Sequence, residues 1–174
     1  MTKKPVAELL FSETDAVPIS TDPATVKPWD LARACVESVP RAWLSSVRPD
    51  SGPHAVPLMP VWADDVPCFA SRPGSRKSRN LARDPRCVLT ATDGTLDLVV
   101  EGEAVRVTDE DGIRRVLDAF KAKYGWELSV RDGSAFADDL PGSPEYGLYR
   151  IVPTRAFGYG ADGATATRWR FEEE

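Results

Sequence analysis

Histidine is nearly absent from this sequence, which has a single one, His54, among 174 residues. One imidazole excludes a histidine-based metal centre and leaves no second histidine for a proton relay. We therefore expect no bound metal. His54 lies in a segment of mixed polar and apolar residues, where a histidine that only hydrogen-bonds to the backbone is the more common finding. It is thus a weak candidate for a catalytic acid or base.

Cysteines and long apolar runs are also scarce. The three cysteines, Cys35, Cys68 and Cys87, form no C-x-x-C pair, and an odd number does not complete a disulfide framework. No stretch approaches the ~18 apolar residues of a membrane span. The apolar run near the N-terminus is interrupted by Glu8 and is too short for a signal peptide. The sequence predicts reduced thiols in a core and a cytoplasmic protein that contacts no membrane.

The chain has no excess of positive charge. Lysine and arginine total 22 against 27 aspartates and glutamates, a net charge of −5. Because affinity for nucleic acid comes mainly from neutralising phosphates, this balance argues against a DNA or RNA partner. Hydrophobic residues make up 42% of the chain, enough for one packed domain. We expect a domain at 28–174, preceded by an arm at 1–27 that lies over the domain or over a partner subunit.

Short strands dominate the rest of the chain. Hairpin turn residues such as Asp93-Gly94 separate segments of alternating polarity. The helices are predicted at 28–39, 75–83 and 109–124, with Thr108 and Gly125 as the caps of the third. Residues 127–146 read as a long irregular loop of the kind that often forms lids. The predicted strands are 41–48, 53–62, 66–71, 86–92, 95–107, 146–159 and 165–171.

Connections by hairpins indicate an antiparallel sheet, and about six or seven short strands favour a closed barrel. The fold class is therefore mainly β, an antiparallel barrel with a few helices. The strand at 53–62 contains Pro53, Pro57 and Pro60, and proline cannot donate to a strand ladder. We expect this strand to be kinked or bulged, with backbone groups that face something other than a neighbouring strand.

Positive charge is concentrated in one place, between Arg72 and Arg86, where only Asp84 opposes it. Gly74 permits a tight turn and Ser75 is a natural N-cap, so the free amides and dipole of the helix that follows favour an anion. Arg76 and Lys77 add charged donors at the same point. The segment predicts a phosphate site, with a solvated basic helix as the alternative.

Three segments together resemble the pyridoxamine 5′-phosphate oxidase-like split-barrel flavoproteins. They are Trp43-Leu44-Ser45-Ser46-Val47-Arg48-Pro49-Asp50-Ser51-Gly52-Pro53-His54, then Val56-Pro57 to Pro60-Val61-Trp62, then Ser75-Arg76-Lys77-Ser78-Arg79-Asn80-Leu81-Ala82-Arg83-Asp84-Pro85-Arg86. The resemblance covers roughly 28–125. It implies an antiparallel split β-barrel that forms a homodimer, with flavin-type cofactors at the dimer interface and a small-molecule substrate.

The resemblance also implies which residues bind the cofactor. Arg76 and Lys77, with Ser75 beside them, match the residues that hold the cofactor phosphate, and Ser71 and Arg72 would lie near the ribityl chain. Arg168 and Trp169 are expected to contribute from the partner subunit. The strand that lines the flavin ring is matched by Val56, Pro57, Leu58, Met59, Pro60 and Val61.

The function implied is an FMN-dependent oxidoreductase that transfers a hydride between the cofactor and a small organic substrate under the 127–146 loop. True pyridoxamine phosphate oxidases end in an Arg-Leu-x-Pro type tail, whereas this chain ends Trp169-Arg170-Phe171-Glu172-Glu173-Glu174. The Lys-x-Arg-Asn-Leu pattern at 77–81 is similar to the branch that uses F420, a deazaflavin with a phosphate and an acidic tail. An F420-dependent reductase, or a non-catalytic flavin- or haem-binding sensor or carrier, are the alternatives.

Overall fold

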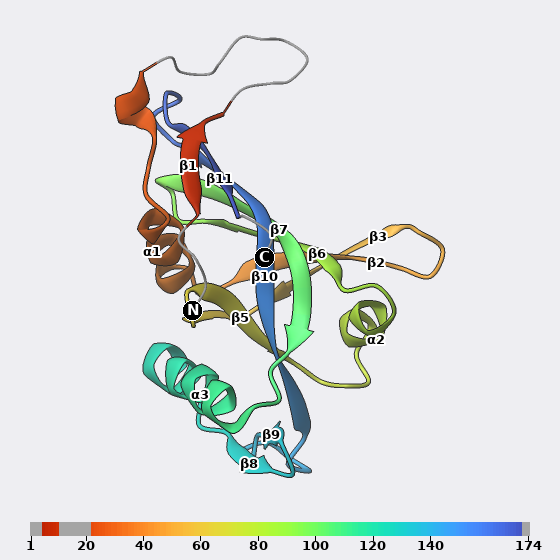
Figure 1. Cartoon of the computed structure of the whole chain (residues 1–174). Coiled ribbons are helices and arrows are strands. Elements are labelled where there is room, and N and C mark those ends of the chain that lie inside the picture. Colours follow the sequence, from red (N-terminus) through yellow and green to blue (C-terminus); the bar gives the residue numbers. More distant parts are fainter. Residues whose placement is uncertain (1–4, 11–21, 172–174) are drawn as a thin grey trace.

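The computed structural model describes residues 5–10 and 22–171. The rest of the predicted arm and the acidic tail at 172–174 lie outside this part of the chain. The described residues confirm the mainly β prediction, since eleven strands form an antiparallel sheet that curls into a split barrel, with helices at its periphery (Figure 1). The strands outnumber the six or seven predicted because one predicted strand divides and several very short strands were missed.

One long strand, β10 (Glu145–Gly160), organises the sheet. It pairs with β11 (Ala166–Arg170), β7 (Leu96–Arg106), β5 (Val66–Ser71) and β9 (Ser134–Phe136). The register with β7 shifts between Pro153 and Arg155, an irregularity of the kind that bends a strand. Because of this bend, the N-terminal end of β10 pairs with β5 and β9, whereas its C-terminal end pairs with β11.

The predicted strand at 53–62 is two strands, and this corrects the sequence analysis. β3 (Pro53–Leu58) pairs with β2 (Ala42–Val47), while β4 (Pro60–Ala63) pairs with β5. Pro60 has no amide hydrogen with which to continue the β3 ladder. The chain therefore changes neighbours at Met59, and β2 continues the sheet through β6 (Arg86–Thr92).

Three α-helices surround the described sheet: α1 (Asp30–Ser38), α2 (Arg76–Arg83) and α3 (Glu110–Tyr124). The N-cap of α3 is Asp109, not Thr108, because the Asp109 carboxylate accepts the Gly112 amide at 2.7 Å. Gly125 ends α3 with a φ of 66°, the left-handed conformation that glycine tolerates, as predicted. The start of α1 lies two residues after Pro28.

Two further segments depart from the predictions. Within 127–146, which was expected to be irregular, β8 (Ser129–Arg131) and β9 form a short hairpin. At the N-terminal side, β1 (Val6–Leu9) pairs with β11, the short helix η1 spans Pro23–Thr25, and the Lys27 amide donates to Thr167 Oγ1 at 3.0 Å. The described parts of the predicted arm thus lie against the chain's own sheet.

Two clusters of buried residues stabilise the fold. The first lies inside the barrel, where Phe69, Leu44 and Trp169 pack against α1 and α2. The second lies under α3, where Phe120 and Val116 meet β4 and β5. None of the described helices is long and apolar enough to cross a membrane.

Candidate functional site

Three serine hydroxyls fasten the start of α2 to the end of β5. Ser71 Oγ lies 2.9 Å from Ser75 Oγ and 2.7 Å from Ser78 Oγ. The Ser75 hydroxyl accepts the Ser78 amide at 3.2 Å, so Ser75 is the N-cap, as predicted. The first amides of α2 have no partner within the helix and carry the positive end of its dipole. This end of α2 has the chemistry of an anion site.

A groove of about 570 Å³ adjoins this end of α2, and we call it the Lys77 groove. Its volume lies within the range of small-molecule sites. Lys77 reaches into it beside Pro57, Leu58 and Met59, the segment where the chain passes from β3 to β4. The residues that line it are Arg41, Pro57, Leu58, Met59, Ala70, Lys77, Phe120, Tyr124, Gly125, Trp126, Asp139, Leu140 and Tyr146.

One wall of the Lys77 groove is aromatic. Trp126 packs edge-to-face against Phe120 at 5.4 Å and against Tyr146 at 5.1 Å between ring centroids. The Tyr124 hydroxyl lies 3.1 Å from the Pro40 carbonyl and 2.9 Å from the Pro60 carbonyl and can donate its one hydrogen to either. Burial raises the pKa of Tyr124 to about 12. Tyr124 is therefore a neutral, fixed part of the wall. Such a wall suits a flat ring.

Positive charge in the groove is not neutralised within the described residues. Lys77 and Arg41 line it and form no ion pair with any described carboxylate, and Asp139 is the one acidic side chain in the lining. Burial lowers the pKa of Lys77. A half-buried cation without a carboxylate partner is costly, which favours an anionic ligand here.

The 127–146 segment contributes Asp139 and Leu140 to the groove. The turn that carries them is tied to the β8–β9 hairpin, because the Asp138 carboxylate accepts hydrogen bonds from Arg131 and Ser143. These donors lower the pKa of Asp138. The predicted lid segment therefore borders the groove, although it is held by more structure than the sequence analysis expected.

The predicted binding residues other than Lys77 and 57–59 do not line the groove. Arg76 is exposed at the first position of α2, and the Arg72 guanidinium lies 5.8 Å from the ring centre of the groove residue Tyr146. Val61 is buried in the cluster under α3, and the Pro60 carbonyl is taken by Lys123 and Tyr124. Of the 56–61 segment, only Pro57, Leu58 and Met59 line the groove.

Arg168 and Trp169 do not lie in the Lys77 groove. Trp169 has no exposed surface, and its indole N–H donates to the Lys27 carbonyl at 2.9 Å. Arg168 forms an ion pair with Glu8 at 2.6 Å. Trp169 is thus part of the core of its own subunit, and its expected reach to a partner's cofactor would need this core to open.

The lone histidine lies on β3 opposite Ser46 of β2. Its Nδ1 is buried and has no hydrogen-bond partner, while the Ser46 hydroxyl accepts from Asn80 of α2 at 3.1 Å. His54 does not line the Lys77 groove. Its predicted catalytic role stays a prediction.

The three thiols take no part in the groove. Cys35, Cys68 and Cys87 are free and buried, and burial raises the pKa of each to about 12. They are therefore protonated and poorly reactive at neutral pH.

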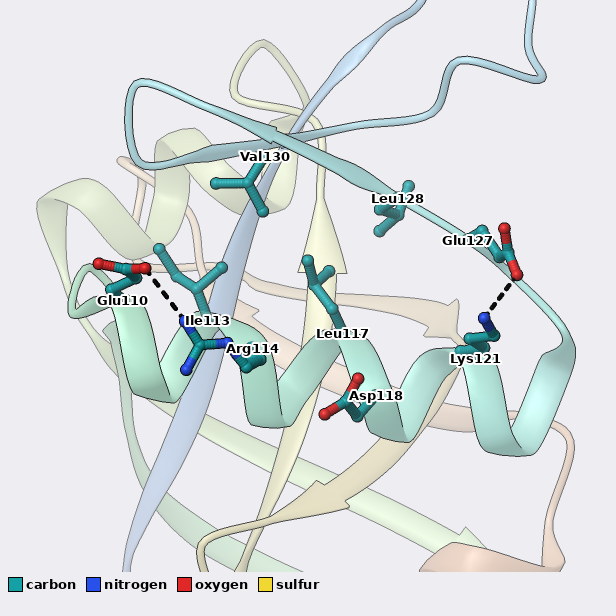
Figure 2. A pocket seen from close by; sticks show the side chains of 9 residues that line it. All are labelled: Glu110, Ile113, Arg114, Leu117, Asp118, Lys121, Glu127, Leu128 and Val130. Carbon is teal, nitrogen blue, oxygen red and sulfur yellow. Dashed lines mark hydrogen bonds and ion pairs between the residues drawn. The ribbon is translucent and has the colours of Figure 1, made fainter.

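A second hollow, of about 320 Å³, lies between α3 and residues 127–130, and we call it the α3 pocket. Figure 2 shows its apolar side chains between two ion pairs. Arg114 pairs with Glu110 at 3.0 Å, and Lys121 pairs with Glu127 at 2.8 Å. The lining residues are Glu110, Ile113, Arg114, Leu117, Asp118, Lys121, Glu127, Leu128 and Val130. Its cations are already neutralised by the protein.

Several residues of the Lys77 groove were not singled out from the sequence for a site. Tyr124 is the last residue of α3, Trp126 lies two residues after it, and Arg41 directly precedes β2. No motif joins these positions, because the fold alone brings them together.

Comparison with known proteins agrees with the fold. Residues 29–159 match the family model described as pyridoxamine 5′-phosphate oxidase. No curated protein matches the sequence closely enough to count as a relative. A solved structure of a candidate pyridoxamine 5′-phosphate oxidase from Listeria innocua is 20% identical, with a TM-score of 0.54, over 74% of this chain and 94% of that one.

Two other solved structures share the fold. General Stress Protein 26 from Bacillus anthracis is 19% identical, with a TM-score of 0.53, over 75% of this chain and 92% of that one. A heme binding protein from Mycobacterium smegmatis is 18% identical, with a TM-score of 0.57, over 76% of this chain. The match spans only 55% of that larger protein. Since the family model covers most of the sequence, the chain belongs to the pyridoxamine 5′-phosphate oxidase family.

Proposed function

We propose that this protein is a flavin-dependent oxidoreductase that binds FMN in the Lys77 groove and transfers a hydride between the flavin and a small organic substrate. The observation that carries the proposal is that two separate predictions meet in one groove. Lys77 was predicted to hold a phosphate, and Pro57, Leu58 and Met59 were predicted to line a flavin ring. All four line the same cavity.

The residues present fit such a cofactor. The start of α2 offers backbone amides, the Ser75 hydroxyl and the cations of Arg76 and Lys77 to a phosphate. From there the groove runs along Pro57, Leu58 and Met59, the segment expected to line the flavin ring.

When bound, the flavin supplies the redox chemistry, and the protein supplies binding, orientation and local electrostatics. Lys77 and the start of α2 anchor the phosphate, and the apolar groove excludes water from the ring. Leu140 of the 127–146 segment lines the groove. No acid or base of this chain is assigned, and His54 is not in the lining.

F420 is the alternative cofactor, because it also carries a phosphate but adds an acidic tail. Two arginines of α2, Arg79 and Arg83, are candidates for contact with that tail. Both are exposed, but the Arg83 guanidinium already donates to the Arg48 carbonyl at 2.7 Å. Arg79 is therefore the better candidate for contact with an acidic extension.

A haem-binding carrier is the second candidate function. The observation in its favour is the unpartnered Nδ1 of His54, taken with the fold shared with a heme binding protein. Haem iron in carriers is commonly held by a histidine, and this chain has no other.

We further propose that the protein is a cytoplasmic homodimer. The outward face of the sheet carries exposed apolar side chains: Trp43 is 54% exposed on β2, Val105 37% on β7 and Val152 41% on β10. The strand registers place all three on one face of the sheet, which fits a surface covered by a second copy. Trp43→Glu is expected to convert the dimer to a monomer in light-scattering chromatography. A wild-type monomer would contradict the dimer.

The test of the proposed function is to identify the bound cofactor by absorbance and mass spectrometry, with FMN and F420 both supplied during expression or reconstitution. Release of FMN, and bleaching of its visible bands by a reductant, is the expected result. A protein that takes up neither flavin contradicts the proposal, and release of haem instead favours the carrier.

A further inference from the structure

Arg41 lines the Lys77 groove but has no role in binding the phosphate or the ring of the proposed FMN. It directly precedes β2, where Ala42 pairs with Leu58, so its backbone lies next to the segment expected to line the ring. The preceding carbonyl, of Pro40, is held at 3.1 Å by the Tyr124 hydroxyl. These contacts fix Arg41 at the Tyr124 side of the groove.

The Arg41 side chain has no described partner that would neutralise it. It lines the groove and forms no ion pair with a described carboxylate. Burial raises the pKa of the Tyr124 phenol, and the positive charge of Arg41 partly opposes this rise. This agrees with a position of Arg41 close to the Tyr124 ring. By contrast, Arg33 on the neighbouring helix α1 is paired with Glu37 at 2.9 Å.

The groove therefore carries two separate cations. Lys77 comes from α2, where the phosphate site lies, whereas Arg41 comes from the start of β2 beside the end of α3. Asp139 is the only acidic side chain in the lining and cannot neutralise both. One phosphate at α2 would neutralise Lys77 and leave the exposed Arg41 guanidinium free to contact a second anion.

We propose that Arg41 is the substrate-specificity residue of the groove and that it binds the carboxylate of a flat, unsaturated organic acid. This inference rests on the proposed function, because it assigns the substrate class of the same site. A guanidinium matches a carboxylate with two parallel hydrogen bonds. Trp126 and Tyr146, which pack edge-to-face with Trp126 backed by the buried Phe120, offer a surface for the flat apolar part of such an acid.

The test compares benzoate with benzamide, two flat probes of nearly the same shape that differ in charge. Binding is measured by ligand-detected NMR and by perturbation of the flavin spectrum, on FMN-loaded protein, so that the phosphate site is occupied. Wild type should bind benzoate at least tenfold tighter than benzamide. Arg41→Gln should remove this preference, Arg41→Lys should retain part of it, and the matched control Arg33→Gln should keep it.

Equal binding of the two probes by wild type, or an undiminished preference in Arg41→Gln, overturns the inference while leaving FMN binding intact. The inference is also overturned if Lys77→Gln abolishes the preference for benzoate and Arg41→Gln does not, because benzoate then binds at the phosphate site. If the protein takes up no flavin, the NMR comparison is made on the protein as purified. A benzoate preference that depends on Arg41 there supports the anion site although the proposed function has failed.

Discussion

The Lys77 groove and the α3 pocket are both lined by apolar side chains and both contain two cations, yet they differ in how those cations are balanced. In the α3 pocket, Arg114 and Lys121 each contact a carboxylate of the same chain (Figure 2). In the Lys77 groove, Arg41 and Lys77 have no such partner among the described residues. Charges that the fold leaves unbalanced in a concave surface are better markers of a ligand than the hollow itself.

The sharpest way to break this comparison is to remove two cations at the start of α2, next to the Lys77 groove, and two in the α3 pocket. Arg76→Ala with Lys77→Ala should weaken FMN binding at least 100-fold in a fluorescence titration, because each charged hydrogen bond to a phosphate contributes about 1.5–3 kcal/mol. The fold should persist, since Arg76 is exposed and Lys77 is only half-buried.

The matched control is Arg114→Gln with Lys121→Gln in the α3 pocket. FMN affinity should stay within twofold of wild type, because these side chains interact with Glu110 and Glu127 and not with the groove. Equal losses of affinity in both double variants would refute the distinction between the two regions.

A smaller effect is expected from pH. Burial lowers the pKa of Lys77, so its proton is lost at a lower pH than for an exposed lysine. The cation is what attracts the phosphate, and FMN affinity should therefore be constant near pH 7 and fall as the pH rises toward that lowered pKa. Lys77→Arg keeps its charge throughout and should show a flatter profile between pH 7 and 10. Identical profiles would show that Lys77 does not hold the phosphate.

The smallest effect is expected in the α3 pocket, where the cations are paired with carboxylates. Lys121 and Glu127 are mostly exposed, with 65% and 71% of each side chain accessible. Exposed ion pairs of this kind contribute about 0–1 kcal/mol. Lys121→Gln should thus change the free energy of unfolding in urea by less than about 1 kcal/mol. A larger loss would mean that the α3 pocket depends on its ion pair more than its exposure suggests.

The fold class and the longer elements could be predicted from the sequence because local signals agree there. The apolar spacing of α3 and the left-handed Gly125 after it specify one helix and its end. The break at Met59 and the β8–β9 hairpin could not be located. Strands of three or four residues, such as β4 and β8, are too short to show an alternating pattern.

The residues of the candidate site also fall into some that the sequence predicts and others that it does not. Ser75 and Lys77 were found because N-cap, dipole and charge coincide within a few residues. Arg41, Trp126 and Asp139 were not, because they come from three distant segments that only the sheet topology brings to one groove. Trp169 illustrates the opposite case, since an aromatic residue expected at a partner's site is fully buried in its own core.

The most direct test of the central claim is a titration of FMN and of F420 into purified wild-type protein, followed by flavin fluorescence and by mass spectrometry of the recovered ligand. The predicted result is stoichiometric, saturable uptake of FMN that the Arg76→Ala, Lys77→Ala double variant weakens at least 100-fold, whereas uptake of F420 alone favours the alternative cofactor. Uptake of neither cofactor, or equal uptake by wild type and the double variant, would contradict the account.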